Sequence, residues 1–131
     1  MRPTQEVAKI IAAYRPTWLV FEDSIPEEKI NDLENTQVLL RETKSDISHY
    51  GDDTFNAVDL AVTIQIFYGF NVAESMLLAE VGLMKALEKS NWKTTASGEH
   101  YLDISTNTDK QQTIKNLTVE KTVNIAEISE N

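Results

Sequence analysis

The clearest alternation of apolar and polar residues in the chain runs from Phe55 to Tyr68. One parity carries the large, mostly β-branched residues Val58, Leu60, Val62, Ile64, Ile66 and Tyr68. A period of two with this composition predicts a half-buried β-strand. At roughly 14 residues the stretch is long for a strand, whose usual length is about five or six. We therefore expect it to run through the middle of a sheet and to project beyond it.

Residues 4–14 carry the spacing of an amphipathic helix. Apolar residues recur every three or four positions, and the alanines between them favour the helical state. Thr4 is a suitable N-cap, and Pro16 disfavours the α conformation in the residue before it. The sequence therefore predicts a helix that begins at Thr4 and ends at Tyr14.

A second amphipathic helix is predicted over residues 72–89. Asn71 and Glu74 have the spacing of a capping box, which would satisfy backbone N–H groups at the helix start. The stripe expected to face the sheet consists of Leu77, Val81, Met84 and Leu87. Gly82 lowers helix propensity by about 1 kcal/mol relative to alanine, and we expect it to let this helix lie close to the sheet.

The other predicted elements are shorter. Residues 26–33 have the composition of a helical turn, and residues 45–54 are expected to connect the strands of a long hairpin. Further strands are predicted at residues 18–21, 37–44, 91–97, 101–103 and 112–123. These elements predict an α+β fold, a two-layer sandwich with a mainly antiparallel sheet, a long hairpin and two helices packed on one face. Residues 1–124 are expected to form this single domain, and residues 125–131 a flexible C-terminal tail.

Composition limits the classes of protein to which the chain can belong. It has 131 residues, no cysteine and a formal net charge of -9. Disulfides and thiolate zinc sites are therefore excluded, and the length allows a core of useful size. No apolar run approaches about 18 residues, the length of a membrane span, so no membrane partner is expected. The acidic charge has the wrong sign for nonspecific nucleic-acid binding, and solubility is its simplest explanation.

Candidate catalytic and metal-binding residues are few. Both histidines, His49 and His100, fall in expected turns, and neither belongs to a His-x-x-x-His or His-Glu-x-x-His pattern. The acids that would have to complete a metal site are Asp52, Asp53, Glu99 and Asp103. The carboxylates of Asp52 and Asp53 beside His49 suit acid–base chemistry, although paired acids in a turn are more often solvated turn formers. We expect no enzyme activity, no metal and no cofactor.

The second parity of the long strand has less charge than a solvated face usually carries. Its residues are Ala57, Asp59, Ala61, Thr63 and Gln65. Phe55 and Phe67 bracket them. Small residues flanked by aromatic rings suit a second surface packed against the strand, as in a subunit interface. The alternative is an ordinary sheet face with two exposed rings.

Three stretches of the chain occur in a distinctive order. They are Tyr50-Gly-Asp-Asp-Thr-Phe-Asn with Val-Thr-Ile-Gln-Ile-Phe-Tyr68, then the second predicted helix, then Asn91-Trp92 with Gly98-Glu-His-Tyr-Leu-Asp103. Together they resemble small tail-module proteins of siphophages that infect Gram-positive bacteria. The order of elements over residues 4–124 also resembles the tail terminators of lambda-like phages.

The resemblance implies a structural function. Tail terminators assemble as hexameric rings on the last ring of tail-tube subunits, stop tube polymerisation and form the surface on which the head docks. The implied partners are further copies of the chain, the major tail tube protein, and a head-completion or connector protein. Genomic DNA is expected to pass through the ring without specific binding. The protein is expected to assemble in the host cytoplasm and to reside in the virion, at the tail end or neck.

The implied subunit or tube interface combines the hairpin tip with the outer face of the long strand. Its residues are His49, Tyr50, Asp52, Asp53, Phe55, Ala57, Asp59, Ala61, Thr63, Gln65 and Phe67. A head–tail connector of similar fold is an alternative. An acidic DNA mimic is a second alternative, disfavoured because the acids are spread through the chain and not gathered on one face. A small hydrolase built on His49, Asp52 and Asp53 is a third.

Overall fold

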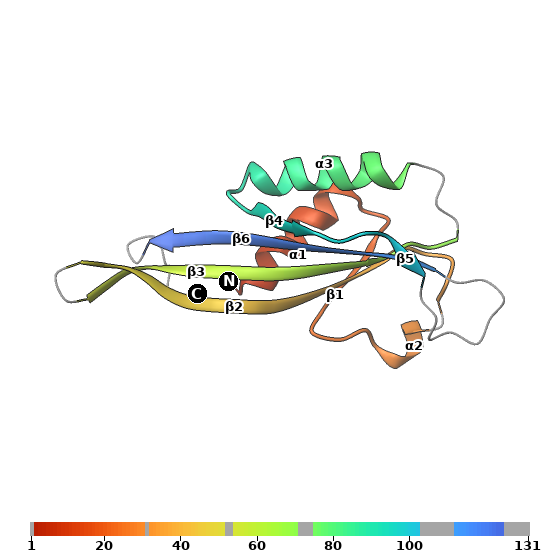
Figure 1. The fold of residues 1–131 in the computed structure, drawn as a ribbon. Coiled ribbons are helices and arrows are strands. Elements are labelled where there is room, and N and C mark those ends of the chain that lie inside the picture. Colours follow the sequence, from red (N-terminus) through yellow and green to blue (C-terminus); the bar gives the residue numbers. More distant parts are fainter. Residues whose placement is uncertain (1, 31, 52–53, 71–74, 103–111, 125–131) are drawn as a thin grey trace.

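The computed structural model describes residues 2–30, 32–51, 54–70, 75–102 and 112–124, and for residues 47–51 and 54–56 it describes the backbone only. These residues form the predicted α+β fold, in which helices cover one face of a mainly antiparallel sheet (Figure 1). The elements are α1 (Pro3–Tyr14), β1 (Leu19–Glu22), α2 (Glu27–Ile30), β2 (Gln37–Gly51), β3 (Thr54–Phe67), α3 (Met76–Glu88), β4 (Lys93–Ser97), β5 (Tyr101–Leu102) and β6 (Thr113–Asn124).

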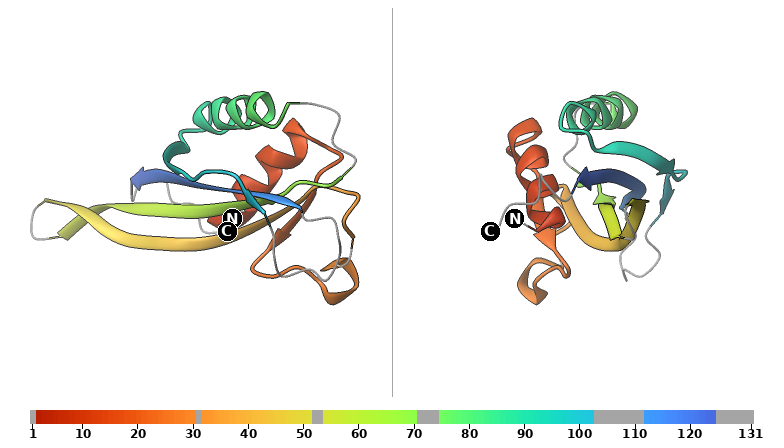
Figure 2. Two further views of the ribbon diagram at one scale, coloured as in Figure 1. Left: turned by 45° about the vertical axis from the view of Figure 1, so that its right-hand side comes forward. Right: turned by 90° about the vertical axis from the view of Figure 1, so that its left-hand side faces the viewer.

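The described strands form one sheet in the order β1-β2-β3-β6-β4, with β5 paired to β6. β1 is parallel to β2, and the other pairs are antiparallel. β3 is therefore the central strand, as its long alternating pattern predicted. Figure 2 shows β2 and β3 reaching well beyond the helices at one end of the molecule.

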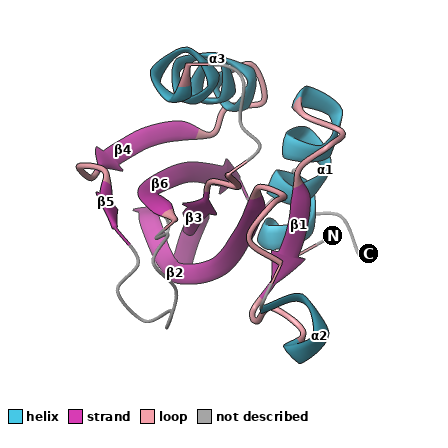
Figure 3. Ribbon diagram, turned by 90° about the vertical axis from the view of Figure 1, so that its right-hand side faces the viewer, coloured by secondary structure: helices cyan, strands magenta, loops and turns pink. Residues whose placement is uncertain are grey.

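The hydrophobic core lies between the sheet and the two longer helices. Figure 3 shows α1 beside β1 and α3 above β4. The apolar parity of β3 faces this core, and Val62, Ile64 and Ile66 are fully buried, as predicted. Neighbouring strands and helices complete the core with Val7, Ile11, Val38, Leu40, Ala79, Leu83, Leu87, Trp92, Leu117 and Val119.

β2 is longer than the sequence predicted. It continues to Gly51, so the expected connection over residues 45–54 is largely strand, and only residues 52–53 separate β2 from β3. The polar residues after Arg41 resemble a loop, but the ladder to β3 holds them extended because the partner strand supplies their backbone hydrogen bonds. The register shifts by one residue between Glu42 and Lys44, which marks a β-bulge.

α1 begins one residue earlier than predicted, and Thr4 is not its cap. Arg2 occupies the N-cap position, and Pro3 is the first helical residue, where its missing N–H costs nothing. The side-chain oxygen of Gln5 accepts the backbone N–H of Arg2 at 2.9 Å. Thr4 is buried instead, and its hydroxyl donates to Glu22 Oε1 at 2.6 Å, which ties α1 to β1.

α3 differs from its prediction in both its start and its buried face. It begins at Met76 with Ser75 as N-cap, and the expected cap at Asn71 lies outside the described residues. The predicted stripe was wrong for Leu77 and Val81, which are exposed, whereas Leu87 is buried as expected. The residues buried on α3 are Ala79, Glu80, Leu83 and Leu87.

The helix is rotated because it packs on α1 as well as on the sheet. The Tyr14 hydroxyl donates to the Ala79 carbonyl at 2.9 Å. Gly82 lies beneath the same hydroxyl, and a Cβ at this position would approach it to 2.1 Å. The glycine therefore permits a close approach to α1, and not to the sheet as the sequence suggested.

Replacing Gly82 by alanine is expected to destabilise the protein by about 1–3 kcal/mol, because Tyr14 must leave its site on α3. Denaturant unfolding measures the loss. Gly98→Ala is the matched control, expected within about 0.5 kcal/mol of wild type, because its nearest new contact is 3.6 Å away. The Gly82→Ala penalty should shrink in a Tyr14→Phe background, and an unchanged penalty would contradict this explanation.

Candidate functional site

The outer face of β3, opposite the helices, carries the interface residues that the sequence predicted. Asp59, Thr63, Gln65 and Phe67 are partly exposed there, and all lie on the parity opposite to the core. Their neighbours across the sheet come from β2 on one side and β6 on the other. The structure thus brings this part of the predicted set together on one surface.

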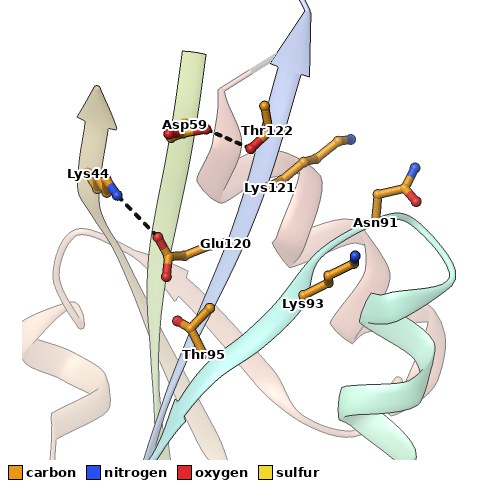
Figure 4. A pocket seen from close by; sticks show the side chains of 8 residues that line it. All are labelled: Lys44, Asp59, Asn91, Lys93, Thr95, Glu120, Lys121 and Thr122. Atoms are coloured by element: carbon orange, nitrogen blue, oxygen red, sulfur yellow. Dashed lines mark hydrogen bonds and ion pairs between the residues drawn. The ribbon is translucent and has the colours of Figure 1, made fainter. Parts of the chain in front are cut away.

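The two alanines of this face are covered within the chain itself. Ala61 pairs with Lys44 on one side and with Glu120 on the other. The side chains of Lys44 and Glu120 form an ion pair at 3.5 Å across the short alanine (Figure 4). Ala57 is likewise buried. The low charge of β3 is therefore offset by charged residues of the adjacent strands, which a single-strand pattern does not reveal.

Among the hollows formed by the described residues, two lie on the outer face. The larger, of about 540 Å³, lies where β4 diverges from β6, and Figure 4 shows Lys93 and Thr95 along one side of it. Asp59 lies on the opposite side and accepts a hydrogen bond from the Thr122 hydroxyl at 2.6 Å. The residues lining this hollow are Lys44, Asp59, Asn91, Lys93, Thr95, Glu120, Lys121 and Thr122.

The second hollow, of about 310 Å³, lies nearer the middle of the sheet. Its lining residues are Leu39, Arg41, Thr63, Gln65 and Asn116. The Tyr101 hydroxyl accepts hydrogen bonds from the side-chain amides of Gln65 at 3.2 Å and Asn116 at 3.1 Å. The outer face is therefore a shallow, polar surface with charges of both signs, suited to a polar protein surface.

The remaining predicted residues belong to the hairpin tip. Asp52 and Asp53 lie outside the described residues, and so do the side chains of His49, Tyr50 and Phe55. Among the residues that are described, no group of three His, Cys, Asp or Glu side chains is arranged to hold a metal ion. The described residues therefore do not test a metal site or a hydrolase site at the hairpin tip.

A buried polar cluster around Glu80 escaped the sequence analysis. The Glu80 side chain is 1% exposed, and its Oε2 accepts the Tyr68 hydroxyl at 2.6 Å. His100 Nε2 lies 2.7 Å from the same oxygen, and Lys115 Nζ lies 3.9 Å from Oε1. Lys115 also donates to the Gly98 carbonyl. The cluster thus joins α3, the end of β3, β6 and the connection between β4 and β5.

A second missed cluster surrounds Lys121, which lies on the inward parity of β6 together with Leu117 and Val119. Lys121 Nζ lies 2.7 Å from Glu6 Oε1 and 5.6 Å from the centre of the Trp92 ring. The Trp92 indole N–H donates to the same Glu6 oxygen at 3.2 Å. This contact fastens α1 to β6 at the start of the projecting strands. The sequence signal was a charged residue at a position where the parity required an apolar one.

Two pKa shifts occur in the described residues, both outside the outer face. The pKa of Arg2 is raised by its hydrogen bond and charge interaction with Asp23. The pKa of Asp32 is lowered, chiefly by the hydrogen bond from the Asn35 side chain. Both groups are solvent-exposed. Arg2 belongs to an ion pair and Asp32 to a turn, so these shifts reflect local structure near α1 and α2 and do not indicate a reactive centre.

These features define an α+β protein with a hollowed, polar outer sheet face. None of the helices in the described part of the chain has the length and apolar character needed to cross a membrane. The chain belongs to the protein family described as "Protein of unknown function (DUF806)", whose family model matches residues 1–124. No curated protein matches the chain.

Proposed function

We propose that this protein is a tail terminator, or a closely related tail-completion protein, of a siphophage. In this role a ring of copies caps the tail tube, stops its polymerisation and forms the surface on which the head docks. The observation that carries the proposal is the projecting arm of β2, β3 and β6 with its hollowed outer face. It occurs on a chain whose order of elements resembles that of the terminators.

The arm extends beyond the part of the sheet that the helices cover (Figure 1). β4 pairs with β6 only as far as Lys93 and Glu120, whereas β3 pairs with β6 as far as Ala57 and Asn124. The β2–β3 ladder continues to its last pair, between Gly51 and Thr54. A projection of this kind suits contact with a protein that lies beyond the body of the subunit, such as a tube subunit below a ring.

The proposed activity depends on shape and self-assembly, without catalysis or a cofactor. The partners are further copies of the chain, the major tail tube protein and a head-completion or connector protein. The acidic charge of each copy would disfavour contact with the phosphates of DNA that passes through the ring. The proposed location is the tail end or neck of the virion, after assembly in the host cytoplasm.

Electron microscopy of particles that lack the gene tests this proposal. A missing terminator should leave overlong tubes without heads. Tails of normal length beside full heads would instead assign the protein to the head–tail connectors of similar fold. Infectious particles of normal yield and shape would reject both assignments. A monomeric purified protein that competes with DNA for a host protein would support the DNA-mimic alternative.

The double variant Thr63→Lys, Gln65→Lys tests the outer face. It places two long cations in the smaller hollow, and we expect at least a tenfold loss of infectious titre when it complements the deletion. Both positions are partly exposed, so stability should change by less than about 1 kcal/mol. Thr17→Lys, at an exposed position between α1 and β1, is the matched control and should complement fully. Full complementation by the double variant would remove the outer face from the proposed interface.

A further inference from the structure

The exposed side of α3 carries a cluster of large apolar side chains. Leu77 is 63% exposed and Leu78 is 72% exposed, and Val81 lies one turn further along the same side. Figure 3 shows α3 at the top of the molecule, with this helix at the surface. Contiguous exposed apolar patches on a protein surface are typical of contacts with another molecule. We name these three residues the α3 cluster.

A groove with a largely apolar floor lies between α1 and β1. Its volume is about 510 Å³. Ala8 and Ala12 lie one helical turn apart and Val20 lies beside them, so the floor consists of short side chains that admit a close neighbour. Gln5, Lys9 and Glu22 form its polar rim. A helix with an apolar side is a suitable occupant for such a groove.

The α3 cluster and the α1–β1 groove match in spacing and charge. The Thr4–Glu22 hydrogen bond places Glu22 at the N-terminal end of α1. If a neighbouring α3 runs antiparallel to α1 with Leu78 over Ala12, the exposed Lys85 reaches the end where Glu22 lies. Leu78 and Lys85 are seven residues apart along α3, a rise of about 10.5 Å. Ala12 and Thr4, the residue bonded to Glu22, are eight residues apart along α1, a rise of about 12 Å. Apolar groups then meet the apolar floor while a cation meets an anion.

We propose that α3 of a second copy of this chain packs in the α1–β1 groove, antiparallel to α1. The two surfaces are different, so the contact is heterologous and generates a closed ring or a filament. This inference rests on the proposed ring-forming function and supplies the contact between its subunits. It leaves the outer sheet face for the tail tube. The outer face is a poorer partner for leucines because the Lys93 ammonium would lose water without gaining a polar partner.

Engineered cysteines test the contact directly, because the natural chain contains none. Leu78→Cys, Ala12→Cys and Lys93→Cys are made as three single variants, mixed in pairs and oxidised. A disulfide requires Cα atoms within about 7 Å, so only neighbouring sites can be linked. We expect a covalent dimer from the mixture of Leu78→Cys with Ala12→Cys. Leu78→Cys alone, and Leu78→Cys with Lys93→Cys, should yield no more than a tenth of that product.

The same oxidation is repeated on tails purified from complemented particles. This second setting tests a ring that assembles only on the tail tube. A Leu78→Cys product with itself or with Lys93→Cys would overturn the inference, and so would the absence of any product in both settings. Tube length in the deletion strain distinguishes failure of the proposed contact from failure of the proposed function. Tails of normal length from complemented particles without the Leu78–Ala12 product would refute the contact alone. Normal tails in the deletion strain would refute the function.

Charge reversal supplies an independent readout of the orientation. Lys85→Glu in the Leu78→Cys subunit should lower the cross-linked yield at least fivefold, because it faces Glu22 of the neighbour. Glu22→Lys in the Ala12→Cys subunit should restore most of the yield. Circular dichroism checks that the Glu22 variant still folds, since this carboxylate also accepts from Thr4. An unchanged yield with Lys85→Glu would overturn the antiparallel arrangement.

Discussion

Replacing Glu80 by alanine is expected to lower the free energy of unfolding by about 3–5 kcal/mol. The substitution removes the acceptor of the Tyr68 hydroxyl and the partner of His100. It also leaves the Lys115 ammonium, only slightly exposed, without its carboxylate. An unpaired buried charge costs more than the ion pair contributes, which is why the loss is large for one side chain. Urea denaturation followed by circular dichroism measures it.

The control is Glu88→Ala, which removes the same carboxylate from an exposed position of the same helix. Its effect should stay within about 0.5 kcal/mol. Glu80→Gln keeps the size and one acceptor oxygen and should give an intermediate loss. Equal stability of the Glu80→Ala and Glu88→Ala variants would show that the buried cluster contributes nothing to the fold.

Trp92→Ala is expected to cost about 3–5 kcal/mol, the usual loss for a fully buried tryptophan. The indole fills the space where the end of α3, the start of β4 and α1 meet. Its N–H also donates a hydrogen bond to the Glu6 carboxylate, and its ring lies near the Lys121 ammonium. For a domain of this size the loss should lower the melting temperature by roughly 10–20 °C, measured by calorimetry.

Trp92→Phe separates packing from the polar contact. It keeps an aromatic ring in the core but removes the indole N–H that donates to Glu6. Its loss should be less than half that of Trp92→Ala. If the two variants were equally destabilised, the hydrogen bond and not the buried volume would dominate this site.

The central strand was predictable because its signal is local. In β3 one parity is apolar from Val58 to Ile66, and a period of two can be read without knowledge of the neighbouring strands. The strand predicted at residues 112–123 is likewise present, as β6. Sheet order was not predictable, because the pairing of β6 between β3 and β4 depends on contacts between residues far apart in the sequence.

The buried face of α3 was mispredicted because periodicity ranks side chains by apolarity alone. The stripe through Leu77 and Val81 is more apolar than the stripe through Ala79 and Glu80. The structure buries the second stripe, because small residues permit contact with Tyr14 and because Glu80 finds polar partners on three other elements. Those partners follow or precede it by many residues, so no local pattern reveals them.

The candidate interface was only partly predictable. The outward residues of β3 were identified correctly as one face, since parity fixes the side of a sheet to which each residue points. The walls of its hollows come from Arg41, Lys44 and Lys93 on other strands. Their proximity to β3 follows from the register of the sheet, which the sequence of one strand does not contain.

The β-bulge at Thr43 affects the direction in which the arm points but not the pairing of β2 with β3. Removing this one residue would leave Glu42 opposite Val62 and Lys44 opposite Ala61, with every side chain on its present side. The local bend and extra twist that a bulge imparts would be lost, so the tip would point elsewhere. Relatives of this chain could therefore redirect the tip toward differently shaped partners by gaining or losing a single residue, without any change in the core.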